Sequence, residues 1–292
     1  MSTLPILAPT HVEPLLRARA AGEPLASTSL DLGLSRVDVH LTPQGVVLPG
    51  GEAVGWNDLE RIARATTGNL GGRCFVVRPD GPQSWAIEEA QLFSAETNRR
   101  YSLLATDSAP TMLISGVQMH RTKGMDPWGD TLNKARAAAP LIGSVLDTAT
   151  GLGYTAIVAA QTATSVVTVE LDPAALEIAR LNPWSRRLFD DPKITQRLGD
   201  SFDVIQEFPE GSFSRVVHDP PAFSLAGDLY SSEFYRQLHR VLGRGGRVFH
   251  YLGNAQSGSG HRVTKGAVQR LQDVGFRRVV SHPEAFGVVA FK

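Results

Sequence analysis

The stretch Ser144-Val145-Leu146-Asp147-Thr148-Ala149-Thr150-Gly151-Leu152-Gly153-Tyr154 decides the fold. Its first four residues, with Val145 and Leu146 at their centre, are read as a short strand. Gly151 and Gly153 let the backbone turn tightly and approach a ligand closely, because they carry no Cβ. The helix expected over 154–161 would then direct unpaired N–H groups and a partial positive charge at that ligand. The stretch therefore predicts a strand, a ligand-binding turn and a helix.

The chain from residue 119 onward alternates short apolar runs with segments of helical pattern. Strands are expected at 144–147, 165–169, 194–197, 215–218, 246–252, 277–281 and 287–291, and helices at 154–161, 173–182, 231–241 and 263–274. Such alternation predicts a parallel sheet with helices on both faces. We expect the last two strands to form a hairpin at the edge of this sheet.

Acidic residues follow three of these strands, at the ends where parallel sheets bind ligands. Asp147 closes the first strand, where its carboxylate would meet a cationic amino acid group and repel a pyrophosphate. Glu170, in Glu170-Leu171-Asp172, is placed to accept two ribose hydroxyls. Asp200, in Gly199-Asp200-Ser201, follows the third strand, where an adenine amino group would lie. The glycine turn alone fits a dinucleotide or S-adenosylmethionine equally, and the third acid favours S-adenosylmethionine.

A fourth strand leads into Asp219-Pro220-Pro221-Ala222-Phe223. The two prolines fix the backbone and remove two N–H donors. Asp219 and the Pro220 carbonyl would then accept hydrogen bonds from an attacking amine, and Phe223 would stack on a planar substrate. Placement of the amine is the main contribution expected from the protein. The alternative is a structural turn in which Asp219 caps nearby N–H groups.

Together these motifs resemble the class I S-adenosylmethionine-dependent methyltransferase family over about residues 119–292, and an uncharacterised group of predicted methyltransferases within it. The resemblance implies a Rossmann-like α/β sheet that is parallel except for an antiparallel C-terminal strand. In it the loop 147–153 would hold the methionine part, Glu170 the ribose and Asp200 the adenine. The implied cofactor-binding residues are Asp147, Thr148, Ala149, Thr150, Gly151, Gly153, Tyr154, Glu170, Leu171, Asp200 and Ser201. The Asp219 motif is similar to that of amino-group methyltransferases.

A rival resemblance is to the spermidine synthases, which transfer an aminopropyl group from decarboxylated S-adenosylmethionine on the same fold. The segments 228–238 and 191–193 look like that family. The family's catalytic loop carries two aspartates, whereas here a single Asp219 precedes two prolines. We therefore rank methyl transfer first, aminopropyl transfer second and NAD-dependent oxidation third.

Residues 1–118 are expected to form a small α+β domain that recognises the substrate. Helices are expected near 12–21 and 57–65, and strands at 37–41, 45–48, 74–77, 91–93 and 111–117. The single cysteine, Cys74, excludes an intramolecular disulfide and is expected to be a buried strand residue.

The segment 116–131 is expected to be a loop that either folds over the cofactor or simply joins the domains. In it His120 would act as a base or a substrate contact, and Asp126 and Asp130 would bind an amine. His218 and His250 are interpreted as core residues.

Composition leaves the substrate open. The 29 basic residues balance the 29 acidic ones, so no overall field attracts polyanions. A nucleobase amine, a protein side chain and a small metabolite all remain as substrates, and nucleic acid stays among them. We expect no metal site, no membrane span and a cytoplasmic protein, since neither a signal peptide nor a long apolar run is visible.

Overall fold

The computed structural model describes residues 4–67, 71–81, 84–223 and 225–292. The chain divides into two compact units. Unit 1 comprises Met1–Trp128 and Glu177–Arg186, and unit 2 comprises Gly129–Leu176 and Arg187–Lys292. The N-terminal unit thus extends past residue 118 and includes a short segment from the second half of the chain.

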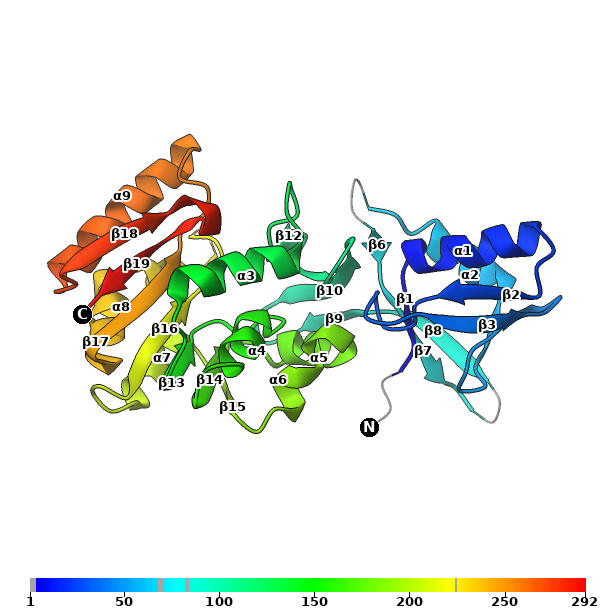
Figure 1. The fold of residues 1–292 in the computed structure, drawn as a ribbon, viewed down its shortest axis with the longest axis horizontal. Helices are drawn as coiled ribbons and strands as arrows, with labels where there is room; N and C mark the ends of the chain where they lie inside the picture. Colours follow the sequence, from blue (N-terminus) through cyan, green and yellow to red (C-terminus); the bar gives the residue numbers. More distant parts are fainter. Residues whose placement is uncertain (1–3, 68–70, 82–83, 224) are drawn as a thin grey trace. The chain divides into compact units, whose positions relative to one another are not determined.

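Unit 1 is built from antiparallel sheets and two helices. The sheets have the strand orders β2-β3-β4-β5, β1-β7-β8 and β12-β11-β10-β6, with β9 paired to β10. The elements, labelled in Figure 1, are β1 (Ile6–Leu7), α1 (Pro9–Ala20), β2 (Leu25–Thr28), β3 (Val37–Leu41), β4 (Gly45–Val47), β5 (Ala53–Gly55), α2 (Trp56–Ala63), β6 (Gly72–Arg73), β7 (Phe75–Pro79), β8 (Trp85–Glu89), β9 (Gln91–Ser94), β10 (Arg99–Ala105), β11 (Thr111–Ile114) and β12 (Val117–Gln118). The expected mixture of helix and sheet is confirmed.

The core of unit 1 lies between its helices and strands. Leu15 of α1 and Leu59 of α2 are fully buried with Val39 and Val77 of the sheets. Cys74 is also fully buried, between β6 and β7, and burial raises the pKa of its thiol. The thiol is therefore held in its neutral, unreactive form.

Unit 2 contains a seven-stranded sheet with the strand order β15-β14-β13-β16-β17-β19-β18. Its strands are β13 (Ser144–Asp147), β14 (Ser165–Glu170), β15 (Ile194–Leu198), β16 (Phe213–His218), β17 (Leu242–Tyr251), β18 (Arg278–His282) and β19 (Gly287–Phe291). Pairing is parallel from β15 through to β17, and β19 is antiparallel to both of its neighbours. The predicted sheet, parallel with an antiparallel C-terminal strand, is confirmed.

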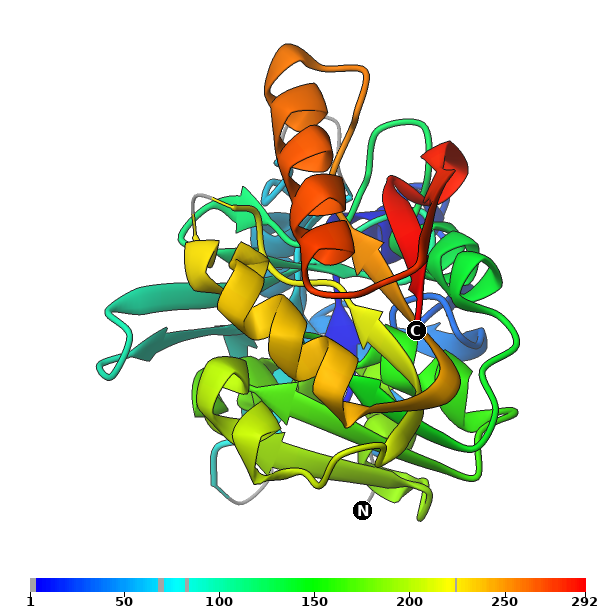
Figure 2. The same cartoon turned by 90° about the vertical axis from the view of Figure 1, so that its left-hand side faces the viewer.

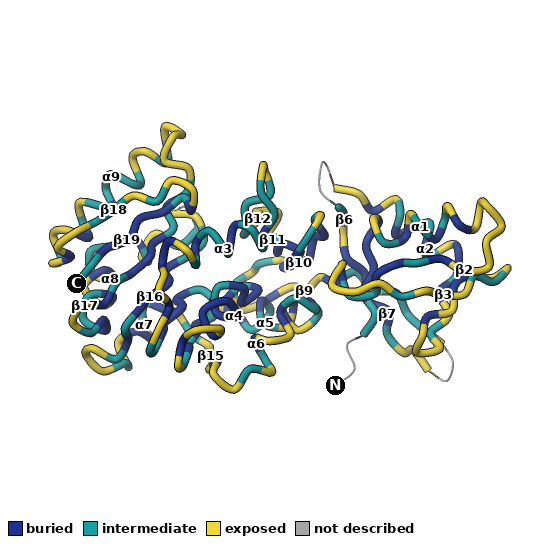
Figure 3. The backbone as a smooth tube through the Cα atoms, in the orientation of Figure 1, coloured by how far each residue is buried: buried dark blue, intermediate teal, exposed yellow. Residues whose placement is uncertain are grey.

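The expected hairpin of the last two strands at the edge of the sheet is confirmed, since β18 and β19 pair antiparallel there. β19 lies inside the sheet between β17 and β18, so that β18 forms the edge. The physical reason is burial, because residues 287–290 are all buried whereas β18 is partly exposed (Figure 3). An apolar strand that is covered on both faces belongs in the interior of a sheet.

Helices cover both faces of this sheet. On one face α7, α8 and α9 share a core with the sheet, and α8 and α9 lie side by side (Figure 2). Helix α4 packs against β13, β14 and β15. The helical segments of this half of the chain are α3 (Pro127–Ala138), α4 (Tyr154–Ala160), α5 (Pro173–Leu181), η1 (Pro183–Ser185), α6 (Arg186–Asp190), α7 (Ser201–Glu207), η2 (Gly227–Tyr230), α8 (Ser232–Val241), α9 (Gly258–Asp273) and η3 (Pro283–Ala285). Of these, η1 and the second half of α5 belong to unit 1.

Helix α3 corrects the expectation of a loop through Thr131. Asp126 accepts a hydrogen bond from the Trp128 N–H across 2.9 Å, and Pro127 occupies the first helical position. An acidic cap followed by proline is a standard helix start, and it places Asp130 and Thr131 on a helix.

Within the ranges given above, no helix combines the length and apolar character needed to cross a membrane. In the same ranges, no group of three or more His, Cys, Asp or Glu side chains is arranged to hold a metal ion.

Candidate active site

The ends of four neighbouring strands meet at one edge of the sheet in unit 2. Asp147 pairs in register with Thr168 of β14 and Val217 of β16. Glu170, the last residue of β14, pairs with Leu198 at the end of β15. The structure therefore brings together the strand ends that carry the predicted acids.

The glycine loop after β13 has the tight geometry expected of it. Gly151 and Gly153 have φ angles of 52° and 75°, in the left-handed region that favours glycine. A Cβ on Gly153 would approach the side chain of Leu188 to 2.6 Å. Thr150 is held by its hydroxyl, 2.7 Å from that of Thr168, and Tyr154 is buried in the first turn of α4. The loop is thus rigid and closely packed.

Asp147 is a buried carboxyl group with one unsatisfied oxygen. Its Oδ2 atom accepts hydrogen bonds from Thr155 and Thr168, each at 3.0 Å. Its Oδ1 atom is buried and has no hydrogen-bond partner among the residues that the structure describes. Burial raises the pKa of Asp147 to about 7. A cationic ligand group would satisfy this oxygen and favour the ionised carboxylate.

Glu170 is held against the glycine loop. Its Oε2 atom accepts a hydrogen bond from the Gly151 N–H at 2.8 Å, and Oε1 accepts one from the Asp172 N–H at 3.1 Å. Burial raises the pKa of Glu170, and these two hydrogen bonds oppose that rise. Because each carboxylate oxygen can accept twice, acceptor capacity remains that a ribose hydroxyl could use. Leu171 beside it presents an exposed apolar side chain.

We call the strand-end residues 147–153, Glu170, Leu171, Asp200 and Ser201 the cradle. Hydrogen bonds of Gly199 and Ser201 tie its last segment to the others. The Ser201 hydroxyl donates to the Thr148 carbonyl across 2.6 Å, and the Gly199 N–H donates to the Glu170 carbonyl across 2.8 Å. Asp200 caps α7 by accepting the Phe202 N–H at 2.8 Å, and it is exposed. The cap uses Oδ1, so Oδ2 is the oxygen that an adenine amino group would meet.

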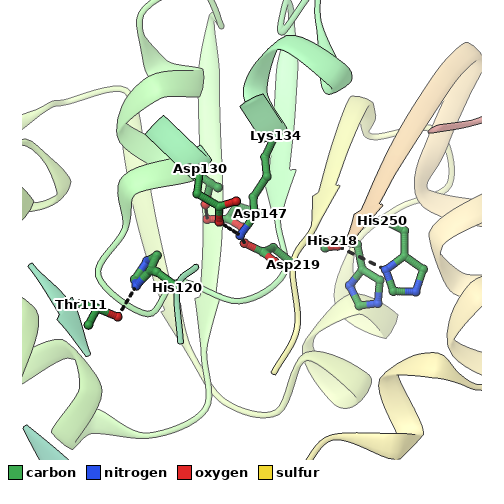
Figure 4. A network of polar contacts seen from close by, with 9 residues as sticks. Thr111, His120, Asp130, Lys134, Asp147, His218, Asp219 and His250 are labelled. Atoms are coloured by element: carbon green, nitrogen blue, oxygen red, sulfur yellow. Dashed lines mark hydrogen bonds and ion pairs between the residues drawn. The ribbon is translucent and has the colours of Figure 1, made fainter. Parts of the chain in front are cut away.

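A buried ion cluster lies at the start of the Asp-Pro-Pro motif, and Figure 4 shows its members converging. The Lys134 ammonium donates to Asp219 Oδ2 across 2.6 Å and lies 2.9 Å from Asp130 Oδ2. It also lies 4.4 Å from the centre of the Tyr251 ring. The side chains of Lys134 and Asp130 are 2% and 0% exposed, whereas that of Asp219 is 18% exposed. Burial lowers the pKa of Lys134, but the two carboxylates more than offset it, so that the net pKa is raised.

Lys134 is a site residue that the sequence analysis missed. Asp130, expected to bind a substrate amine, binds this lysine instead. The available signal was the spacing of four residues between Asp130 and Lys134. On a helix that begins at Pro127, this spacing places both side chains on one face, where they can form an ion pair. The ammonium thus faces two carboxylates, and Asp147 lies close enough to Asp219 for their charges to interact. The Lys134 ammonium therefore compensates the charge of these two carboxylates from within the protein.

The rest of the Asp-Pro-Pro motif forms a turn beside Asp219. Pro220 is buried, and the Tyr230 hydroxyl donates to the Pro221 carbonyl at 3.0 Å. The Phe223 ring is 51% exposed and contacts Tyr230 edge-on, with ring centres 5.4 Å apart. A turn anchored in this way leaves about half of Phe223 exposed.

His218 and His250 are confirmed as core residues. His218 Nε2 must donate to the Leu229 carbonyl at 2.9 Å, so its Nδ1 accepts from the Thr148 hydroxyl at 2.6 Å. Burial lowers the pKa of His218 to about 3, and it lowers that of His250 as well. Both rings are therefore neutral and structural.

His120 belongs to unit 1, where its Nδ1 atom lies 3.1 Å from the Thr111 hydroxyl (Figure 4). This contact holds the ring within its own unit. Its role as a base or substrate contact stays a prediction.

Comparison with known proteins defines the class. Residues 146–250, which include the strand ends described above, match the family model of the methyltransferase domain. The fold and this match therefore define a protein with a methyltransferase domain. The chain is also 46% identical over 219 residues to the uncharacterised protein MJ1233 of Methanocaldococcus jannaschii, which covers 74% of this chain and 76% of that protein. It belongs to the same family as MJ1233.

More distant matches are to aminopropyltransferases. A polyamine aminopropyltransferase of Aeropyrum pernix is 29% identical over 128 residues, which is 42% of this chain and 38% of that protein. A spermidine synthase solved with the transition-state analogue AdoDATO superposes with a TM-score of 0.57 at 17% identity, over 69% of this chain and 71% of that one. The spermidine synthase of Thermotoga maritima gives 0.55 at 17% identity, over 69% and 70%. These structures establish a spermidine-synthase-like fold.

Proposed function

We propose that the protein is an S-adenosylmethionine-dependent methyltransferase that methylates an amino nitrogen. The observation that carries the proposal is the buried, unpartnered Oδ1 atom of Asp147 beside the glycine loop. A buried carboxylate oxygen without a partner is costly unless a ligand satisfies it. The amino acid part of S-adenosylmethionine carries the positive charge that would do so.

The residues of the cradle fit the rest of the cofactor. S-adenosylmethionine would supply a methyl group activated by its sulfonium. Asp147 would hold the amino group, Glu170 the two ribose hydroxyls, and Asp200 the adenine amino group. The rest of the loop 147–153 would hold the methionine part.

Asp219 would position the acceptor nitrogen. Its Oδ1 atom has no hydrogen-bond partner among the described residues, and its side chain is partly exposed. The nitrogen lone pair would form the new N–C bond while the electron pair of the broken S–C bond stays on sulfur. The N–H proton would pass to Asp219 Oδ1 and then to water. Placement by Asp219, the Pro220 carbonyl and Phe223 would supply most of the acceleration.

Aminopropyl transfer is the second candidate. The sequence match to a polyamine aminopropyltransferase and the excess of carboxyl groups favour it. The single Asp219, with Oδ2 already occupied by Lys134, disfavours it. A dinucleotide is disfavoured because Asp147 would repel a pyrophosphate. We assign substrate selection to the N-terminal domain, 1–118, because the cradle itself is taken up by cofactor contacts.

The test is calorimetry with S-adenosylhomocysteine, decarboxylated S-adenosylmethionine and NAD, followed by transfer assays. We expect S-adenosylhomocysteine to bind and NAD not to bind. We also expect the purified protein, added to an extract of cells that lack it, to transfer a tritiated methyl group from S-adenosylmethionine to RNA, protein or small molecules in that extract. Formation of methylthioadenosine from decarboxylated S-adenosylmethionine and putrescine would establish the second candidate instead.

A further inference from the structure

The Lys134 ammonium lies where the Asp-Pro-Pro motif would otherwise offer a carboxylate to a cationic substrate. Side chains from three elements face it, namely Asp130 from α3, Asp219 from the end of β16 and Tyr251 from the end of β17. It is 2.6 Å from Asp219 Oδ2 and only 2% exposed. The closest carboxylate oxygen of the motif is thus already neutralised from within the protein.

We propose that Lys134 determines the charge of the acceptor, because its ammonium occupies the position against Asp219 that a protonated substrate amine would take. The acceptor is therefore an uncharged nitrogen on a planar group, such as the exocyclic amine of a nucleobase. This inference rests on the proposed methyltransferase function and narrows its substrate class.

Electrostatics supports this assignment. A second ammonium at Asp219 would share one carboxylate with Lys134 and would meet a like charge within a few ångströms, in a poorly solvated site. Lys134 has no room to move away, since it is held by two carboxylates and covered by the Tyr251 ring. An uncharged N–H donor meets no such penalty and needs only the second oxygen, Oδ1.

The shape of the site supports it too. The Phe223 ring, 51% exposed, offers a flat surface next to the turn that carries Asp219. Planar nitrogen compounds stack on such a ring, whereas an aliphatic polyamine gains little from it.

The experiment measures putrescine binding by calorimetry in the presence of methylthioadenosine. We compare the full-length protein with Lys134→Met and with the double variant Asp130→Asn/Lys134→Met. The double variant removes the ammonium together with the buried charge of Asp130, so that of the cluster only the Asp219 carboxylate remains. It therefore keeps the test valid if Lys134→Met, which leaves Asp130 uncompensated, fails to fold. We expect at least a tenfold gain in putrescine affinity in the folded variants. Adding Asp219→Asn to the double variant should abolish the gain.

Lys265→Met, which changes an exposed lysine on α9, is the matched control and should gain nothing. Two results would overturn the inference: wild type that already binds putrescine as tightly as the variants, or a folded double variant with no gain. Either result leaves methyl transfer by the wild-type protein to be judged by its own assay. Aminopropyl transfer by the wild type would instead overturn the proposed function and this inference together.

Discussion

The Gly151 N–H donates a hydrogen bond to Glu170 Oε2 across 2.8 Å, so the glycine loop after β13 is tied to the end of β14. The second oxygen of Glu170 is held by the Asp172 N–H. The carboxylate is therefore fixed in position before any ligand binds. Its remaining acceptor capacity is what we assign to the ribose of the cofactor.

Replacing Glu170 with alanine should weaken S-adenosylhomocysteine binding at least tenfold. The variant loses the charge-assisted acceptor sites of the carboxylate and frees the loop at Gly151. Calorimetry measures the affinity, and Glu210→Ala, an exposed glutamate of the same unit, is the control. Unchanged affinity in Glu170→Ala would remove this residue from the cofactor site.

Asp219→Asn should lower turnover at least a hundredfold while sparing cofactor affinity. The amide no longer accepts the N–H proton, and it no longer balances the Lys134 ammonium. Single-turnover methyl transfer and S-adenosylhomocysteine calorimetry separate the two effects. Asp203→Asn, at an exposed position on α7, should keep both. Retained turnover in Asp219→Asn would contradict the role given to the carboxylate.

Stability should fall as pH rises, because of Asp147. Burial raises its pKa from an ordinary value of 3.8 to about 7 in the folded protein. The folded state therefore binds the proton of Asp147 more tightly than the unfolded state does. The resulting contribution to the free energy of unfolding is greatest below pH 4 and is lost by pH 7. Asp147→Asn should remove this fall, so that its stability relative to wild type rises by about 2–3 kcal/mol between pH 5 and pH 8. Urea unfolding at the two pH values measures it.

The same titration should appear in ligand binding. A cationic ligand favours the ionised form of Asp147, so S-adenosylmethionine affinity should increase through pH 7 in wild type. Asp147→Asn should flatten that increase. An equal pH dependence in both proteins would mean that another group meets the cation.

Gly153→Ala should cost about 2–4 kcal/mol of stability, from backbone strain and overpacking against Leu188. Gly245 supplies the matched control, since its φ of 72° resembles the 75° of Gly153 but a Cβ there meets nothing within 4 Å. Gly245→Ala should therefore show the strain alone. Equal losses in thermal unfolding would mean that the Leu188 contact is unimportant.

The sheet and its strand ends could be predicted from the sequence for a physical reason. Each buried strand is a short apolar run, and residues at the ends of adjacent parallel strands must share one edge. Asp147, Glu170 and the turn at Asp200 are accordingly brought together by the hydrogen bonds of Gly151, Gly199 and Ser201. The short apolar runs and the acidic residues that follow them were therefore sufficient to predict this part of the site.

Long-range partners could not be predicted in the same way. The pairing of Lys134 with Asp219 joins residues 85 positions apart, and nothing near either residue encodes it. The insertion of β19 between β17 and β18 depends on burial from both faces, which a short apolar strand at the end of a chain does not reveal. The indole of Trp184 donates to the Leu32 carbonyl, 152 positions away, and that contact has no local signal either.

The interior position of β19 bears on how the protein is made. During synthesis β17 leaves the ribosome some forty residues before its neighbour β19, so its open edge and the core residues beneath it wait for that strand. Unpaired strand edges of this kind are sites of aggregation. The edge of β17 therefore stays exposed to other chains until residues 287–291 have been made and pair with it.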